Sequence, residues 1–142
     1  PAQRQVLFEN TARSVGDARA VASWWDGRAF DRILADVPCS ASGVVRRHPD
    51  AKWLRRESDI AGFAATQKAI VDALWLTLAP GGKMLYATCS VFAQENARQV
   101  EAFLGRHADA RQLRNKGAAS SDAYYLPDAD HDGFYYALLQ KA

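Results

Sequence analysis

The sequence predicts an α/β fold built around a partly parallel sheet, and three observations carry this prediction. Apolar, strand-like runs at 30–36 and 83–88 flank a long segment with helical spacing of apolar residues. A Pro-Gly-Gly at 80–82 stops the helical pattern just before the second run. A further apolar run at 133–139 closes the chain. This order favours right-handed crossovers and strands whose carboxyl ends gather at one edge of the sheet.

The first part of the chain is expected to hold short helices and one buried strand. Four segments are predicted there: a helix at 3–13, a turn or strand end at 15–19, a short helix at 20–25 and a strand at 30–36. The strand ends in the carboxylate of Asp36, and Pro38 and Gly43 mark the loop that follows it.

The remainder of the chain is expected to alternate helices and strands. The predicted segments are a short helix capped by Asp50 and reaching residue 56, a long helix capped by Asp59 at about 60–78, a strand at 83–88, a helix at 92–104, a short strand at 110–113, a polar mobile loop at 116–122 and a final strand at 133–139. In the helix at 92–104, Val100 and Phe103 are expected to face the core, and Glu95 and Asn96 to face outward.

Length, composition and charge limit the classes of protein to which this chain can belong. The 142 residues fit a single domain at 1–142, and 49% hydrophobic with 24% charged residues is typical of a globular protein. No apolar run approaches the roughly 18–20 residues that cross a bilayer, and the first ten residues do not resemble a signal peptide. We therefore predict a cytoplasmic protein with no membrane partner. The net charge of +2 is too small to indicate a nucleic-acid partner by itself.

The only two cysteines each follow a predicted strand. Cys39 lies in the run Asp-Val-Pro-Cys-Ser at 36–40, and Cys89 in Ala-Thr-Cys-Ser at 87–90. A single cysteine at a strand end is more often a small buried apolar residue than a functional thiol. Two of them at the ligand-binding edge of an α/β sheet, beside Asp36, indicate a site. Two cysteines are too few for a structural zinc site and the three histidines lack ligand spacing, so no metal site is predicted.

These two motifs together resemble the active site of the RNA cytosine-C5 methyltransferases. The wider sequence is most similar to the Sun (Fmu) family, which modifies small-subunit ribosomal RNA. Further matching stretches lie at 42–50, 52–56, 94–96 and 132–137. The resemblance runs from about residue 16 to 141. It implies a Rossmann-like methyltransferase fold, S-adenosyl-L-methionine as the methyl donor and 16S ribosomal RNA as the partner.

The resemblance also implies a role for each matched residue. Cys89 is the nucleophile that adds to carbon 6 of cytosine, and Cys39 assists release of the methylated product. Asp36 lies beside the base and the methyl donor, where it must be protonated or share a proton with N3. Pro38 fixes its loop, and Asp17 contacts the adenine end of the cofactor. The expected cofactor contacts are therefore Asp17, Asp36 and Pro38. Taken alone, the Gly-Asp at 16–17 is only a turn signal.

A basic cluster follows the first cysteine motif. Its residues are Arg46, Arg47, His48, Lys52, Arg55 and Arg56, offset by Asp50 and Glu57. On charge alone, phosphate binding and a solvated helix face are equally good interpretations. With the family resemblance, Arg46, Arg47, His48 and Lys52 become candidates for binding RNA. Trp53 is more often a core residue than a platform beneath RNA. Asp132 is expected to shape the turn into the last strand, with a target-site contact the less favoured alternative.

Two features of the family pattern are not matched: the Gly-rich cofactor loop and the acidic residue that holds the cofactor ribose. The Gly-rich cofactor loop of the Ala-Pro-Gly-Gly-Lys type does not precede Asp17, and the Pro-Gly-Gly-Lys at 80–83 precedes a strand instead of following one. The prediction is therefore an incomplete methyltransferase fold: the C-terminal part of a catalytic domain, lacking its first strands and cofactor loop. We expect weak or absent binding of S-adenosyl-L-methionine and an inactive fragment. We also expect a homodimer formed through the exposed edge of the strand at 30–36.

Two other function classes remain open from the sequence. One is a non-catalytic RNA-binding module that keeps the fold and the basic cluster, although two cysteines in matching context argue against it. The other is a thiol redox protein using Cys39 and Cys89, which is disfavoured because the Cys-x-x-Cys spacing is absent.

Overall fold

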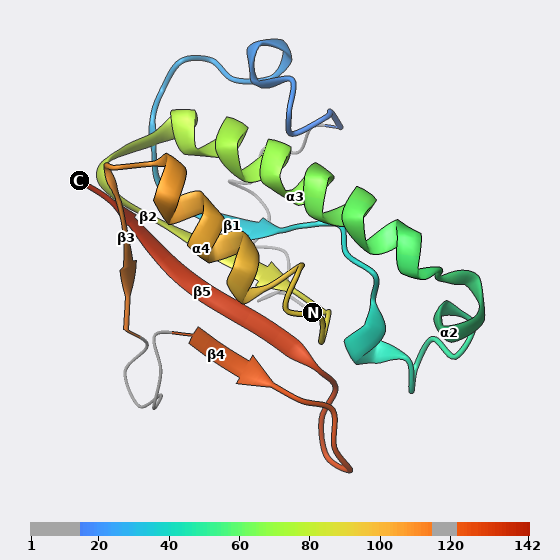
Figure 1. The fold of residues 1–142 in the computed structure, drawn as a ribbon. Coiled ribbons are helices and arrows are strands. Elements are labelled where there is room, and N and C mark those ends of the chain that lie inside the picture. The colour runs from blue at the N-terminus through green and yellow to red at the C-terminus, as the bar shows by residue number, and fades with distance from the viewer. Residues whose placement is uncertain (1–14, 115–121) are drawn as a thin grey trace, which may run out of the picture.

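The computed structural model describes residues 15–114 and 122–142. The helix predicted at 3–13 and nearly all of the loop predicted at 116–122 lie outside these residues. The described chain forms a mixed sheet of five strands with its two longest helices on one face (Figure 1), which confirms the predicted α/β class. No helix in the described ranges is long and apolar enough to cross a membrane.

The sheet has the strand order β1-β2-β5-β3, and β4 also pairs with β5. The strands are β1 (Phe30–Asp36), β2 (Leu78–Thr88), β3 (Ala110–Leu113), β4 (Asp122–Tyr125) and β5 (Phe134–Lys141). β1 and β2 are parallel, whereas β5 is antiparallel to β2, β3 and β4. The register Asp36↔Ala87 brings the ends of β1 and β2 together, as expected for the two cysteine motifs. Among the described residues, β1 forms one edge of the sheet, and β3 lies at the other end of this order.

The Pro-Gly-Gly at 80–82 lies inside β2 and does not precede it, which corrects the predicted strand start at residue 83. The pairing of β1 with β2 shifts between Phe30↔Leu78 and Arg32↔Lys83, so residues 79–82 bulge out of the ladder. Gly81 has a φ of 75°, a backbone conformation that residues with a Cβ rarely adopt.

Four of the five described helices lie where a helix was predicted, with shifted ends, whereas η2 lies in the segment predicted as a loop. They are η1 (Val21–Ser23), η2 (Ser42–Val44), α2 (Ala51–Leu54), α3 (Glu57–Thr77) and α4 (Ala97–Arg106). α3 begins three residues earlier than predicted because Asp59 is not its cap. Its carboxylate instead accepts a hydrogen bond from the backbone N–H of Arg56 at 2.9 Å, from inside the first turn. α4 begins later than predicted, because residues 92–96 form turns.

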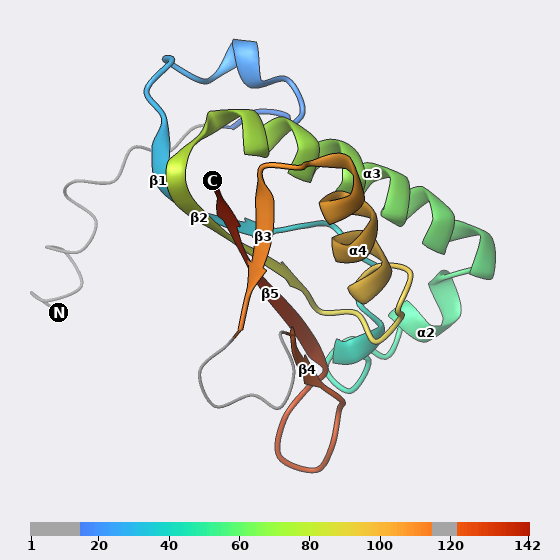
Figure 2. The same ribbon diagram turned by 60° about the vertical axis from the view of Figure 1, so that its left-hand side comes forward.

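The core lies between α3, α4 and one face of the sheet. Trp75, Tyr86, Phe103 and Tyr135 are fully buried there, and the rings of Trp75 and Phe103 meet edge-to-face at 5.0 Å. Figure 2 shows both helices on the same side of the sheet. Side chains that point to the opposite face are less covered, and Leu34 of β1 is 67% exposed. The ends of β1 and β2 therefore open toward a face that no described helix covers.

Candidate functional site

The two cysteines meet although 50 residues separate them in the chain. Cys39 follows β1 and Cys89 follows β2, and their Sγ atoms are 3.3 Å apart with no disulfide between them. Both thiols are partly buried. The predicted pairing of the cysteine motifs at one edge of the sheet is therefore realised as direct contact. At this distance one thiol donates a hydrogen bond to the other sulfur.

This contact shifts the pKa values of the two thiols in opposite directions. The hydrogen bond with Cys89 lowers the pKa of Cys39 from 9.0 to about 7, assisted by the backbone N–H groups of Ala41 and Cys89. The same hydrogen bond, together with burial, raises the pKa of Cys89. The pair therefore loses its first proton near neutral pH, and the remaining S–H stabilises the thiolate. The thiolate of the pair therefore forms on Cys39, and a thiolate on Cys89 requires transfer of the remaining proton from Cys89 to Cys39.

A buried carboxylate holds the two cysteine loops together. Glu95 is fully buried and accepts hydrogen bonds from the backbone N–H of Ser40 at 2.8 Å and from its hydroxyl at 2.6 Å. The Ser90 hydroxyl also donates to Glu95, at 2.6 Å. Ser40 and Ser90 are the residues directly after Cys39 and Cys89. Glu95 was expected to face outward, which is wrong: residues 92–96 precede α4 as turns and direct this side chain inward.

Further hydrogen bonds surround this carboxylate. Gln67 of α3 donates to Glu95 at 3.1 Å and to the carbonyl oxygen of Pro38 at 2.9 Å. Asn96, also expected outward, is buried: its amide donates to the Ser90 carbonyl at 2.8 Å, and its oxygen accepts from Thr88 at 2.6 Å. Each buried polar side chain of this network thus has a hydrogen-bond partner, which is the condition for burying it at low cost.

Gly43 ties the cysteine loops to the start of β5. Its N–H donates to the carbonyl oxygen of Cys89 at 2.8 Å, and its own carbonyl accepts from the N–H of Gly133 at 2.8 Å. A Cβ at position 43 would lie 2.2 Å from the Gly133 oxygen and 2.9 Å from the Cys89 oxygen. Only glycine permits this approach. Just before it, Ala41 turns the loop sharply with a φ of 61°.

A cavity of about 400 Å³ opens beside Cys89, and Cys39 is not among the residues that line it. Its lining combines apolar, aromatic and charged side chains from β1, β2, β5 and the loop after Cys39: Leu34, Asp36, Val44, Arg47, His48, Ala87, Thr88, Cys89, Phe134 and Tyr136. Of the predicted site residues, Asp36, Arg47, His48 and Cys89 therefore share one cavity. Its volume falls in the range of small-ligand sites, roughly 300–1,000 Å³.

Asp132 fixes the two arginines of the basic cluster that lie nearest the cavity. It is buried, and its carboxylate lies 2.5 Å from the Arg47 Nε and 3.4 Å from an Arg46 terminal nitrogen. Arg46 also donates to the carbonyl oxygen of Ala129 at 3.0 Å. Besides preceding β5, as expected, Asp132 orients cations from a distant loop. The two arginines are thus partly neutralised and held in place.

The other predicted site residues lie outside this cavity. Asp17 is exposed and its carboxylate binds Arg19 at 2.7 Å; hydrogen bonds from Arg19 lower the pKa of Asp17 to about 2. The Pro38 carbonyl points toward Gln67 of α3, which fits a loop-fixing role. Lys52 of α2 lies over the ring of Trp53, at 5.5 Å from its centroid. Trp53 was expected in the core, which is wrong: it is 81% exposed, because α2 is a single turn on the outside of the molecule.

Comparison with known proteins matches the sequence of this chain to one family. The family model described as 16S rRNA methyltransferase RsmB/F matches residues 2–140. The chain belongs to the 16S rRNA methyltransferase RsmB/F family. The ribosomal RNA small subunit methyltransferase B of Vibrio cholerae is 53% identical over 135 residues, which cover 94% of this chain and 31% of that protein. The corresponding protein of Pectobacterium carotovorum is 56% identical over 127 residues, covering 89% of this chain and 30% of its own length.

Solved structures agree with the fold. The crystal structure of NSun6 from Pyrococcus horikoshii with SFG has a TM-score of 0.80 and 26% identity, covering 97% of this chain and 36% of that one. The predicted methyltransferase fold and family are thereby confirmed. This chain spans about a third of the length of these RsmB/F relatives.

Sequence reasoning missed the residues that hold the site together. Glu95, Asn96 and Gln67 carry its hydrogen-bond network, and Asp132 fixes its arginines. One signal was available: residues 94–96 match the pattern of the RsmB/F family although they were expected on the surface. Polar residues that match a family motif are candidates for a role in the site, even where helical spacing places them on the surface.

Proposed function

We propose that the protein carrying this chain methylates carbon 5 of a cytosine in 16S ribosomal RNA, in the cytoplasm, through a covalent cysteine–cytosine intermediate. The observation that carries the proposal is the 3.3 Å contact between Cys39 and Cys89 beside a cavity that Asp36 lines. The names of the RsmB/F relatives, which are ribosomal RNA methyltransferases, support the choice of substrate.

Cys89 acts as the nucleophile in this proposal. Carbon 5 of cytosine reacts poorly with a methyl donor until a thiolate adds to carbon 6. When the Cys89 thiolate forms the C6–S bond, the electron pair of the C5–C6 double bond moves toward N3 and O2. Asp36 stabilises that charge by sharing a proton with N3. Carbon 5 then has enamine character and is ready to take the methyl group.

Cys39 acts in product release. After methylation, carbon 5 carries both a methyl group and a proton, and the proton must leave before the ring regains its double bond. Cys39 holds the proton that Cys89 gave up and must first release it to solvent. The resulting Cys39 thiolate then accepts the C5 proton, the C–H electron pair re-forms the C5–C6 bond, and Cys89 leaves as a thiolate. N3 returns its proton at the same time. The backbone N–H groups of Ala41 and Cys89, which also lower the pKa of Cys39, do not depend on the Cys89 thiol and favour this thiolate.

S-adenosyl-L-methionine, when bound, supplies the electrophilic methyl group. The described residues fit part of a site for it. Asp36 and Leu34 both line this cavity with exposed side chains, so they offer the donor one polar and one apolar contact. Asp17 and Pro38 are the remaining proposed contacts, through the adenine end and through the fixed loop. For the 142-residue chain alone we expect weak or absent binding by titration calorimetry, and micromolar affinity would overturn this expectation.

RNA phosphates are proposed to bind Arg46, Arg47, His48 and Lys52. His48 and Arg47 line the cavity that would take the cytosine, so they suit the backbone of that nucleotide. Asp132 holds Arg46 and Arg47 in fixed directions, which lowers the entropy lost when they bind RNA.

The test is covalent trapping in the natural-length protein with 16S ribosomal RNA and S-adenosyl-L-methionine. Cys39→Ser removes the group that accepts the C5 proton, so a protein–RNA adduct that survives denaturing gels should accumulate. Cys89→Ser, the matched variant, should give neither adduct nor product. An adduct that persists in Cys89→Ser, or methylation unaffected by it, would overturn the proposal. If neither variant changes methylation and RNA still binds, the alternative of a non-catalytic RNA-binding module is favoured.

A further inference from the structure

A second, larger hollow lies on the other side of the loop that follows Cys39. We call it the α2–α3 groove. It has a volume of about 770 Å³ and is bounded by α2, the first turns of α3 and the loops near residues 40–45 and 92–94. Val45, Ala51, Ile60, Ala64 and Phe92 give it an apolar floor. Phe92 is 41% exposed, so a large aromatic surface is open to a ligand.

The rim of the groove carries positive charge that the described protein does not neutralise. Lys52, Arg55 and Arg56 line it, against the single acid Glu57. In the described ranges, no carboxylate forms an ion pair with Lys52 or Arg56. Arg46 and Arg47, in contrast, are already engaged by Asp132. The uncompensated cations of the basic cluster therefore face the groove and not the cysteine cavity.

Two contacts orient the planar guanidinium of Arg55, which lines the groove. Its Nε donates to the carbonyl oxygen of Ser40 at 3.2 Å, and its guanidinium lies 5.2 Å from the centroid of the Phe63 ring. A guanidinium held in one orientation presents a plane on which a nucleobase can stack. The exposed ring of Phe92 offers the same kind of platform.

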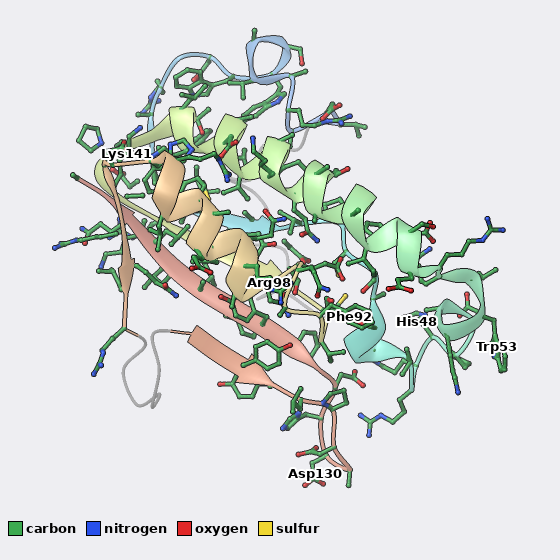
Figure 3. The ribbon with its side chains drawn as sticks, in the orientation of Figure 1. His48, Trp53, Phe92, Arg98, Asp130 and Lys141 are labelled. Carbon is green, nitrogen blue, oxygen red and sulfur yellow. The ribbon has the colours of Figure 1, made fainter. Side chains whose placement is uncertain are left out.

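One segment of chain separates the groove from the cysteine cavity. Ser40, Ser42 and Val45 line the groove, whereas Val44, Arg47 and His48 line the cavity. In Figure 3, His48 and Trp53 lie at the end of the molecule that holds α2, and Phe92 lies further inward, on the side toward Arg98. An RNA strand whose target base enters the cavity therefore leaves it next to the groove.

We propose that the α2–α3 groove binds a nucleotide that flanks the target cytosine in the RNA substrate. The base lies against Phe92 and the Arg55 plane, and its phosphate lies between Lys52 and Arg56. The inference rests on the proposed function for the identity of the substrate. The charge of the rim favours a nucleotide as the occupant. Lys52 and Arg56, which have no carboxylate partner among the described residues, suit a phosphate, whereas an apolar protein segment would bury them without partners. The chemical class of ligand is a single-stranded RNA nucleotide.

The experiment uses the natural-length protein and 16S ribosomal RNA transcribed with 4-thiouridine. Irradiation should cross-link RNA to the peptide that contains Phe92, as located by mass spectrometry. Phe92→Ala should weaken RNA binding roughly tenfold, and Phe92→Trp should restore it. Lys52→Ala with Arg56→Ala should reduce the slope of log affinity against log salt by about 0.7 per lost phosphate contact. Arg98→Ala is the matched control, because Arg98 is an exposed cation on α4 outside the groove.

The outcomes separate this inference from the proposed function. Adduct formation at Cys89 with unchanged affinity in the groove variants would overturn the inference and leave the proposed function standing. A groove cross-link with no adduct would support the groove and overturn the covalent mechanism. If chemical acetylation of Lys52 is already blocked in RNA-free protein, another part of the same polypeptide fills the groove and the inference fails.

Discussion

The Glu95 carboxylate accepts two hydrogen bonds from Ser40, one from its backbone N–H at 2.8 Å and one from its hydroxyl at 2.6 Å. It accepts a third from the Ser90 hydroxyl. One buried side chain thus fixes the residues that follow both cysteines. The 3.3 Å sulfur contact therefore depends on a residue that touches neither sulfur.

Removing this carboxylate should loosen the site. Glu95→Ala leaves the Ser40 N–H buried without an acceptor, and we expect the free energy of unfolding to fall by about 3 kcal/mol. Glu95→Gln should cost less, because its amide oxygen still accepts from that N–H and the serine hydroxyls can reorient. Urea denaturation measures both. Glu101→Gln, an exposed change on α4, should have little effect; equal losses at both positions would contradict the role of Glu95.

The reactivity of the thiols should depend on their contact. A pKa of Cys39 near 7 means that alkylation by iodoacetamide falls about tenfold per pH unit below 7, where the pair is protonated, and levels off above it. Cys89→Ala removes the hydrogen bond that stabilises the thiolate. The reaction midpoint should then rise from about 7 toward the ordinary value of 9.0. A midpoint that stays unchanged in Cys89→Ala would show that the contact does not set this pKa.

The close approach at Gly43 should tolerate no side chain. In Gly43→Ala the new Cβ would lie 2.2 Å from a backbone oxygen of Gly133, so the loop between the two cysteine motifs must move. We expect a lower melting temperature and loss of the Cys89–Gly43 hydrogen bond. Gly62→Ala is the matched control, since nothing lies within 4 Å of its Cβ position. In the interior of α3 it should stabilise by about 0.5–1 kcal/mol. Similar melting temperatures for the two variants would contradict the clash.

The outer edge of β1 should pair with a second copy when this 142-residue chain is prepared alone. Its side chains, including Leu34, are mostly exposed, and an uncovered strand edge is a template for another strand. Light scattering should give the mass of a two-fold dimer. Leu34→Lys should shift it toward monomer, whereas Leu76→Lys on α3, also at an exposed leucine, should not. A monomer for the unaltered chain would remove the basis for this prediction.

The same sulfur contact gives the redox interpretation its one structural argument, since tertiary structure replaces the missing Cys-x-x-Cys spacing. We nevertheless expect two free thiols per chain when the protein is titrated in air-equilibrated buffer. A single disulfide that forms and reduces reversibly, without loss of fold, would favour the redox alternative.

Much of the fold followed from local pattern. The strand at 30–36 and the short strand at 110–113 have the predicted bounds, because apolar runs between turn residues specify strands locally. Helix ends were less accurate: α3 begins at Glu57 because Asp59 binds a backbone N–H from inside the helix. β4 was missed because its four residues are too few to indicate a strand by their pattern, and only the pairing with β5 across the connection at 126–133 makes them one.

The sequence by itself determined the fold class, the family and the placement of Cys39, Cys89 and Asp36 at strand ends. Those features depend on the spacing of apolar residues along the chain and on short contiguous motifs. Only the tertiary structure decided that the two sulfurs touch, that Glu95 turns inward and that Asp132 holds Arg46 and Arg47. Each of these contacts joins loops far apart in the chain. These contacts form because buried polar groups need hydrogen-bond partners in the folded protein. The periodicity of a helix or a strand does not predict which distant residue becomes the partner.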